Sequence, residues 1–304
     1  MAAGASRHGP VAQLLIAWSP LSLILVAYAV AGWVSAPLGA DVDATNRLGF
    51  EVALTWPAQV DRTLLGGVPT VWLQQHLVDG TTHWYDAAAA LVYSTHFVAI
   101  PLLTAYVWFA LRDRFVPLLA SLLVFTVVGM TGYVVSPAAP PWLASQRGEI
   151  GPVERVSHLG WEHLHLDWIS VLTVSGQSGS NPVAAMPSLH AGSAMLVALV
   201  LWPVLGAAGR TLALGYVLVM GLTLVYTGEH YVVDVVAGWL TAAAAACAGV
   251  VLARLRRTGR WPAPRPALPR WGPAAPSSRR CSARRVPPTG RPTASLSHPP
   301  GPRR

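Results

Sequence analysis

Two histidines and one aspartate carry the most reactive side chains of this sequence. His230 and Asp234 lie four residues apart in T-G-E-H-Y-V-V-D-V-V-A-G, at the start of a long apolar run. Positions i and i+4 share one face of a helix, so the Asp234 carboxylate can hold the His230 imidazole. His190 closes P-S-L-H and also begins an apolar run. Ionisable groups at the edge of a membrane span are costly and are functional by default.

These residue types are suited to nucleophilic and acid–base chemistry. A neutral imidazole becomes a nucleophile when its other nitrogen donates a hydrogen bond to a carboxylate, because that bond selects the tautomer. A second histidine, with a reference pKa of about 6.5, can act as a general acid at neutral pH. The alternative is structural: His230 and Asp234 would cap a transmembrane helix, and His190 would be an interfacial histidine.

The composition indicates a membrane protein with several spans. Of the 304 residues, 53% are hydrophobic and only 11% are charged, and the mean hydropathy is +0.45; such values exclude an ordinary soluble domain. All 21 basic residues are arginines, and 13 of them lie from Arg254 onward, beyond the last apolar run. A basic flank in that place is a topology signal. We therefore expect no nucleic-acid partner, despite a net charge of +8.

Apolar runs predict an all-α, polytopic membrane protein with six transmembrane helices. The runs cover about residues 11–34, 87–111, 115–135, 188–207, 211–226 and 231–255. The first run is long enough to cross a hydrocarbon core of about 30 Å. A cleaved signal peptide is the alternative, but the run is long for one, which favours an anchor.

The segments between the spans predict interfacial helices in the outer loops. V-P-T-V-W-L-Q-Q-H-L is one such amphipathic piece within residues 35–85. The loop 136–186 opens with S-P-A-A-P-P-W, which we expect not to be helical. The run W-E-H-L-H-L-D-W at 161–168 holds two histidines and an aspartate at positions i, i+2 and i+4. These residues could form a metal site, but an interfacial helix anchored by the two tryptophans is favoured. We expect no metal or other cofactor.

The chain divides into three segments. Residues 1–49 form an N-terminal segment with the first span, 50–255 a membrane-embedded catalytic domain, and 256–304 an Arg/Pro-rich tail expected to be disordered and cytoplasmic. With the N-terminus inside, the inner segments hold 17 of the 21 arginines and the outer ones hold 12 of the 13 acids. The positive-inside rule therefore predicts that both termini are cytoplasmic and that the histidines lie at the extracytoplasmic face. We expect the protein in the plasma membrane.

Two motifs in a fixed order resemble a known family. P-S-L-H at 187–190, followed one span later by H-Y-V-V-D at 230–234, resembles the type 2 phosphatidic acid phosphatase superfamily. The P-A-A-P-P-W loop at 137–142 is similar to the branch that contains fungal inositol phosphorylceramide synthase. The resemblance covers about residues 50–255 and implies a six-helix core and metal-independent chemistry on a phosphate ester.

The resemblance also implies a role for each reactive residue. His230 would attack phosphorus and form a phosphohistidine, Asp234 would orient it, and His190 would protonate the leaving oxygen. The superfamily's early lysine-to-arginine motif is absent, and Thr223 and Leu224 occupy the positions of its Ser-Arg pair. Sphingomyelin synthases and the ceramide-synthase branch resemble this chain in lacking that arginine, and its loss strengthens the case for phosphotransfer as the alternative.

Further residues are predicted to bind the substrate. Ser188 begins a helix whose first free amides are suited to an anion. Arg147 and Arg155 lie in the outer loop, and we favour Arg147 as the residue that binds phosphate. For each of them, the alternative is an arginine that is simply solvated in the loop. Trp142 belongs to the P-P-W loop at the same level. His96 lies deep in the second apolar run, where it must face the bundle interior. There it would support the site or a headgroup pocket, or it would be a hydrogen-bonded interior histidine.

These observations predict an integral membrane lipid phosphatase that acts on a phospholipid or an isoprenoid (di)phosphate. One alternative is a lipid phosphotransferase that moves a phosphoryl headgroup to an alcohol acceptor; Glu229, beside the nucleophile, would contact the acceptor hydroxyl or serve as a helix N-terminal acid. Another is a non-catalytic lipid binder or transporter on the same scaffold. The expected partners are the lipid phosphate and membrane lipids. The sequence leaves the lipid, the acceptor and the oligomeric state open.

Overall fold

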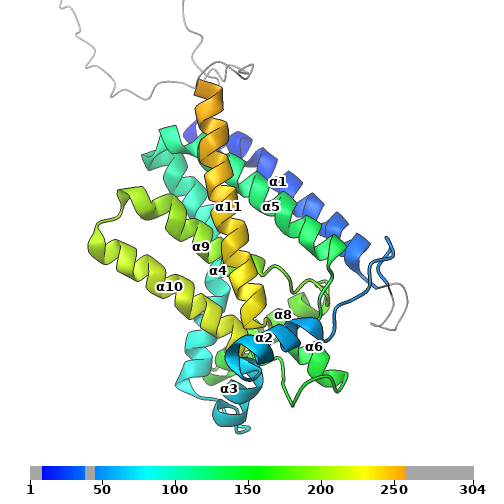
Figure 1. The fold of residues 1–304 in the computed structure, drawn as a ribbon. Helices are drawn as coiled ribbons and strands as arrows, with labels where there is room; N and C mark the ends of the chain where they lie inside the picture. Colours follow the sequence, from blue (N-terminus) through cyan, green and yellow to red (C-terminus); the bar gives the residue numbers. More distant parts are fainter. Residues whose placement is uncertain (1–8, 38–44, 258–304) are drawn as a thin grey trace, which may run out of the picture. The chain divides into compact units, whose positions relative to one another are not determined.

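The computed structural model describes residues 9–37 and 45–257, and these are helical throughout, apart from turns, loops and isolated β-bridges (Figure 1). The all-α prediction is confirmed for this part of the chain. The predicted tail beyond residue 257 lies outside the described residues, as do the first eight residues and 38–44 of the predicted N-terminal segment.

Six longer helices form a bundle. They are α1 (Pro10–Ser35), α4 (Trp84–Ala110), α5 (Phe115–Val135), α9 (Leu189–Leu201), α10 (Ala207–Tyr226) and α11 (Val232–Arg257). Shorter helices connect them: α2 (Trp56–Leu65), α3 (Pro69–Leu77), α6 (Pro141–Gln146), α7 (Leu159–His163), α8 (Asp167–Ser178), and the 3₁₀ turns η1 (Arg112–Arg114) and η2 (Trp202–Val204).

Within residues 9–37 and 45–257, four helical stretches are long and apolar enough to cross a membrane. They are Trp84–Ala110, Arg112–Val135, Ala207–Tyr226 and Val232–Leu255. The other two predicted spans appear as shorter apolar helices, Ile24–Ser35 and Leu189–Val204. A multi-pass arrangement agrees with these lengths, and the six-span topology stays a prediction.

Helix ends differ from the predicted boundaries where capping chemistry acts. α4 begins at Trp84, before the predicted residue 87, because Asp86 accepts a 2.7 Å hydrogen bond from the His83 amide in a capping box. The expectation that the P-P-W loop holds no helix is wrong at its end. Pro140 is extended and Pro141 is the first residue of α6, where its missing N–H is no loss.

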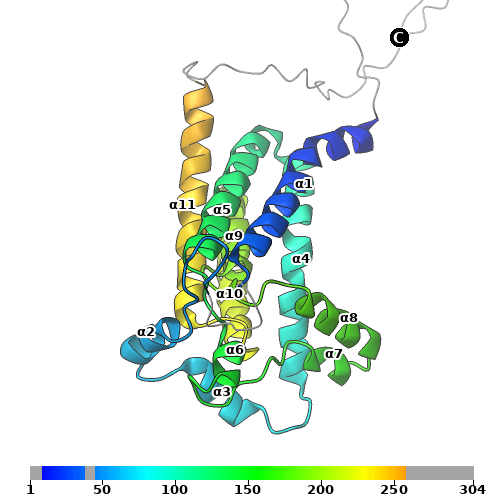
Figure 2. The ribbon, with the colours of Figure 1, turned by 90° about the vertical axis from the view of Figure 1, so that its right-hand side faces the viewer.

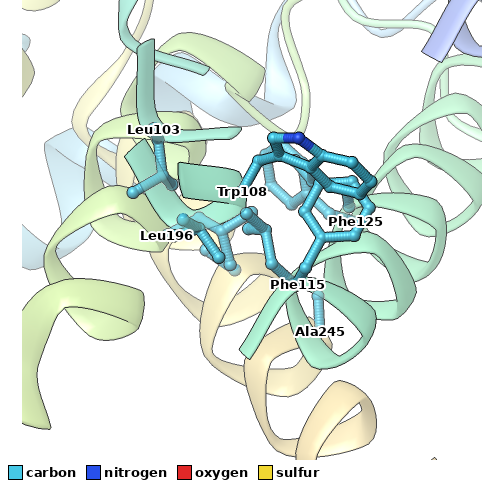
Figure 3. Close-up of a cluster of buried hydrophobic side chains, with 10 residues drawn as sticks. Leu103, Trp108, Phe115, Phe125, Leu196 and Ala245 are labelled. Atoms are coloured by element: carbon cyan, nitrogen blue, oxygen red, sulfur yellow. The ribbon is translucent and has the colours of Figure 1, made fainter. Parts of the chain in front are cut away.

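An apolar cluster holds α4, α5, α9 and α11 together near the η1 turn (Figure 3). The Trp108 and Phe115 rings meet edge to face with centroids 4.7 Å apart. Leu196 of α9 is fully buried in this cluster. α11 packs most extensively on α5 and α9. This cluster therefore sets the spacing between α9, which carries His190, and α11, which begins two residues after His230.

The short helices gather at the opposite end, where α9 and α11 begin (Figures 1 and 2). The helix predicted at V-P-T-V-W-L-Q-Q-H-L is present as α3, and its interfacial placement stays a prediction. The single interfacial helix predicted at 161–168 is wrong, because His165 adopts a left-handed conformation with φ of 57° and separates α7 from α8. Among the residues that the structure describes, no cluster of His, Cys, Asp or Glu is arranged to hold a metal ion.

Candidate active site

The first turns of α9 and α11 are in direct backbone contact. The Ser188 amide donates a 3.0 Å hydrogen bond to the Asp234 carbonyl. A Cβ on Gly238 would overlap the Ser188 carbonyl oxygen, and one on Gly192 would lie 2.8 Å from the Gly238 carbonyl. Glycine at these positions permits the close approach. As a result, the rings of His190 and His230 lie with centroids 5.8 Å apart.

Ser188 acts as the N-cap of α9. Its hydroxyl accepts a 3.2 Å hydrogen bond from the Ala191 amide, and its side chain is fully buried. The hydroxyl thus satisfies one of the free amides of the helix. The anion-binding role predicted for Ser188 stays a prediction, while the contacts show a residue that holds the two helix starts together.

His230 faces Asp234 across a short gap. The distance from His230 Nδ1 to Asp234 Oδ2 is 3.7 Å, too long for a hydrogen bond. Asp234 is fully buried and His230 is 4% exposed. Asp234 Oδ2 accepts from the Tyr231 amide at 2.9 Å. Within the described residues, His230 Nδ1 and Asp234 Oδ1 have no hydrogen-bond partner. Because Nδ1 faces the carboxylate, Nε2 is the nitrogen left for a substrate.

His190 is enclosed by aromatic groups from α4. The His96 ring lies 4.1 Å from it between centroids, and Tyr93 stacks on it at 5.2 Å. His96 Nδ1 is 2.9 Å from the Ser193 hydroxyl, which donates to the His190 carbonyl at 2.8 Å. His96 therefore lies in the bundle interior against His190.

Asp61 of α2 caps the start of α11 and was not identified from the sequence. Its two carboxylate oxygens accept from the Val232 and Val233 amides at 3.0 Å each, and it is 1% exposed. The pKa of Asp61 is raised overall, mainly by burial and also by the nearby Asp234 charge, although the hydrogen bonds from the two amides lower it. Asp61 fixes the end of the helix that carries Asp234.

The turn before His230 is held by the neighbouring segments. Gly228 has φ of +78°, and a Cβ there would come within 2.6 Å of the Glu154 carbonyl. The Trp142 amide donates to the Gly228 carbonyl at 3.2 Å. The Leu224 carbonyl accepts from both the Glu229 and His230 amides, at 3.1 and 3.2 Å. His230 is thereby fixed through its main chain.

Glu229 is the centre of a second polar network. Arg155 Nε and Nη2 each donate to its carboxylate at 2.8 Å, in a paired geometry. Ser157 and Gln177 also donate to it, at 2.9 and 3.0 Å. Arg147, favoured above for phosphate, is exposed at the C-cap of α6, and its side chain has no hydrogen bond or ion pair within the described residues.

Comparison with known proteins decides the family. The PAP2 superfamily profile matches residues 56–248. The chain belongs to the PAP2 superfamily. A curated relative, the phosphoinositol dihydroceramide synthase of Bacteroides thetaiotaomicron, is 32% identical over 168 residues, which is 51% of this chain and 53% of the relative. The chain thus spans about half the length of the curated relative it matches. No solved structure matches it.

Membership in the PAP2 superfamily confirms the resemblance drawn from the two motifs. The match supports a family of membrane lipid phosphatases and phosphotransferases. His190, His230 and Asp234 all lie inside the matched segment.

Proposed function

We propose that this protein is a membrane lipid phosphotransferase that uses His230 as a nucleophile. The donor is a phospholipid or an isoprenoid phosphate, and the acceptor is an alcohol, with hydrolysis by water as the competing reaction. The observation that carries the proposal is the contact of α9 and α11, which brings His190 to His230 while His230 Nδ1 faces Asp234.

In the first step, His230 Nε2 attacks phosphorus and a P–N bond forms. The P–O bond to the leaving alcohol breaks, and His190 gives that oxygen a proton. The imidazole becomes positively charged, and the Asp234 carboxylate stabilises it through the Nδ1 proton. The 3.7 Å separation of His230 and Asp234 closes on substrate binding, as catalytic hydrogen bonds tighten in the reacting complex.

In the second step, the acceptor oxygen attacks phosphorus and the P–N bond breaks. The acceptor's proton passes to His190, which returns to its starting state. The burial of His230 and Asp234 limits the access of water and supports transfer to an alcohol. The relative named as a synthase, and the absence of the superfamily's usual arginine at the position of Leu224, support the same choice.

The arginine distribution supports a site at the extracytoplasmic face. His190, His230 and Asp234 lie at the starts of α9 and α11, the end that the positive-inside rule assigns to the outside. The donor lipid would lie between the helices with its phosphate at the histidines, and both termini would be cytoplasmic.

The test uses purified full-length protein in detergent with EDTA. Phosphatidic acid, phosphatidylinositol, isoprenoid phosphates and isoprenoid diphosphates are supplied one at a time, with and without a long-chain ceramide as acceptor. We expect turnover that resists EDTA and is lost in His230→Ala. A new phosphorylated acceptor, detected by mass spectrometry, establishes transfer, whereas phosphate release alone establishes a phosphatase. Turnover unchanged in His230→Ala overturns the assigned nucleophile, and lipid binding without turnover favours a lipid binder.

A further inference from the structure

The proposed reaction needs a cation that the familiar motif positions do not supply. Phosphoryl transfer gathers negative charge on the equatorial oxygens, and enzymes stabilise it with fixed positive groups. Here those motif positions hold Thr223 and Leu224, whose carbonyls accept main-chain hydrogen bonds of the turn before His230. Building on the proposed function, we propose that Arg155 binds the phosphoryl oxygens and that Glu229 positions Arg155 for this purpose.

The main chain on both sides of Arg155 is fixed beside the nucleophile. Gln74 accepts from the Glu154 amide at 2.8 Å and donates to the Glu154 carbonyl at 2.9 Å. On the other side, the Val156 amide donates to the Thr227 carbonyl at 3.2 Å. Arg155 is therefore held against the turn that leads into His230, although its position in the sequence is far away.

The Arg155 side chain is held in one orientation, and one of its nitrogens remains unpaired. Nε and Nη2 bind the Glu229 carboxylate, while Nη1 has no hydrogen-bond partner within the described residues. The Arg155 side chain is 24% exposed and the Glu229 side chain only 7%, so the guanidinium is on the accessible side of the pair. One free donor edge thus lies beside Glu229, the residue that precedes His230 in the chain.

A second unpaired donor lies beside the same guanidinium. The Arg155 Cζ atom is 5.2 Å from the centre of the Trp142 ring. Trp142 Nε1 is buried and has no partner within the described residues. A buried indole N–H ordinarily has an acceptor. A phosphoryl oxygen on Arg155 Nη1 would be in the vicinity of this N–H, and guanidinium suits phosphate because its donors lie in one planar fork.

Two rival accounts make different predictions. In the first, Arg155 only neutralises the buried Glu229 carboxylate, and in the second, the exposed Arg147 binds the phosphate. A single change at Arg155 does not separate the first rival from the proposal, because it leaves Glu229 as an unpaired buried charge and destabilises the fold. The double variant R155Q/E229Q removes both charges and so leaves no unpaired carboxylate.

The experiment compares Arg155→Gln, R155Q/E229Q and Arg147→Gln, with Arg62→Gln as the control for loss of one outer arginine. Arg62 is exposed, and among the described residues its side chain donates only to the Glu149 carbonyl. We expect kcat/KM to fall about 100-fold in Arg155→Gln and to stay as low in the double variant. Arg147→Gln and Arg62→Gln should keep wild-type turnover. Recovery of the double variant to within about threefold of wild type, or a comparable loss in Arg147→Gln alone, overturns the proposal.

Inorganic phosphate supplies a readout that needs no turnover. We expect phosphate to raise the unfolding temperature of the wild-type protein and of His230→Ala, and to have no effect on R155Q/E229Q. Equal phosphate stabilisation of the double variant overturns the role of Arg155, whatever the lipid assays show. If phosphate stabilisation depends on Arg155 but no lipid phosphate is turned over, the proposed function fails while the anion site stands.

Discussion

The two ends of the bundle use the same helices for opposite purposes. Near η1, α4, α5, α9 and α11 meet in an apolar cluster around Leu196 and Trp108 (Figure 3). Where α9 and α11 begin, the same helices bury carboxylates and imidazoles instead. Asp234 is fully buried, and Glu229 is 7% exposed. The apolar end sets the spacing of the helices, and the polar end holds the candidate catalytic residues at that spacing.

The buried carboxylates at the polar end differ in how fully they are hydrogen-bonded. Asp61 and Glu229 have all their carboxylate oxygens paired. His230 Nδ1 and Asp234 Oδ1 have no partner within the described residues, although each is buried. Unpaired buried polar atoms cost free energy, and in native proteins such exceptions are expected at functional sites. The comparison therefore predicts variants that separate activity from stability.

The largest expected effect is on chemistry, in Asp234→Asn. The amide oxygen still accepts from the Tyr231 amide, so the unfolding temperature should be unchanged or higher. The carboxylate that selects the His230 tautomer is lost, and kcat should fall about 1,000-fold. Steady-state kinetics and thermal unfolding in the same detergent measure both. A large loss of stability with kcat retained would make Asp234 a structural residue.

The converse variant is Leu196→Ala in the apolar cluster. Leu196 is fully buried, so its truncation should cost about 2–5 kcal/mol of unfolding free energy. Activity per folded molecule should stay within about twofold of wild type, since no polar contact changes. Leu218→Ala, at a site that is 61% exposed on α10, is the matched control and should change little. If Leu196→Ala reduces kcat without loss of stability, then stability and activity are not divided between the apolar and polar ends.

Gly238→Ala tests the close contact between the starts of α9 and α11, because it forces the two helices apart. The new methyl group would overlap the Ser188 carbonyl oxygen. A displacement of about 1 Å at a catalytic pair can cost about 100-fold in rate, and overpacking costs about 1–3 kcal/mol. Gly215→Ala, where no heavy atom lies within 4 Å of the added Cβ, is the control. Full activity in Gly238→Ala would show that the close contact of the helix starts is not needed.

A smaller effect is expected from removing the cap on α11. Asp61→Ala deletes two hydrogen bonds to the Val232 and Val233 amides and should cost about 1–2 kcal/mol of stability. Asp61→Asn retains one acceptor oxygen and should cost less. Chemical unfolding of the two variants measures the difference. If Asp61→Ala is as stable as the wild-type protein, then Asp61 does not hold the start of α11.

The smallest effect is a pH dependence at Asp79, in the loop before α4. Hydrogen bonds from the Thr81 side chain and amide, and from His83, lower the pKa of Asp79 to about 2. Because the folded-state pKa lies below the ordinary value, the contribution to stability is present above about pH 3.8 and is lost as the pH falls through about 2. The difference in unfolding temperature between wild type and Asp79→Asn should shrink over that range. A pH-independent difference would contradict this assignment, and activity should not change.

The sequence was sufficient to predict the longer helices and to single out His190, His230 and Asp234, which the fold brings together. Long apolar runs and the two ordered motifs carry that information locally. The partners of these residues are not local. Asp61 is 171 residues from Val232, and Arg155 is 74 residues from Glu229. No periodicity links such pairs, because they meet only when short helices fold back over the helix starts. The break at His165 likewise follows from a left-handed residue that the pattern of tryptophans does not reveal.

The most direct test of the account is to find the phosphorylated residue. Wild-type protein is mixed with a turned-over lipid phosphate and quenched under alkaline conditions that preserve phosphohistidine, and its peptides are analysed by mass spectrometry. We expect phosphate, or the phosphoryl headgroup, on the His230 peptide, and none in His230→Ala. His190→Ala, which lacks the proposed acid, should form this adduct more slowly. Turnover with no adduct on His230, or with an adduct on another residue, would contradict the assignment of His230 as the nucleophile.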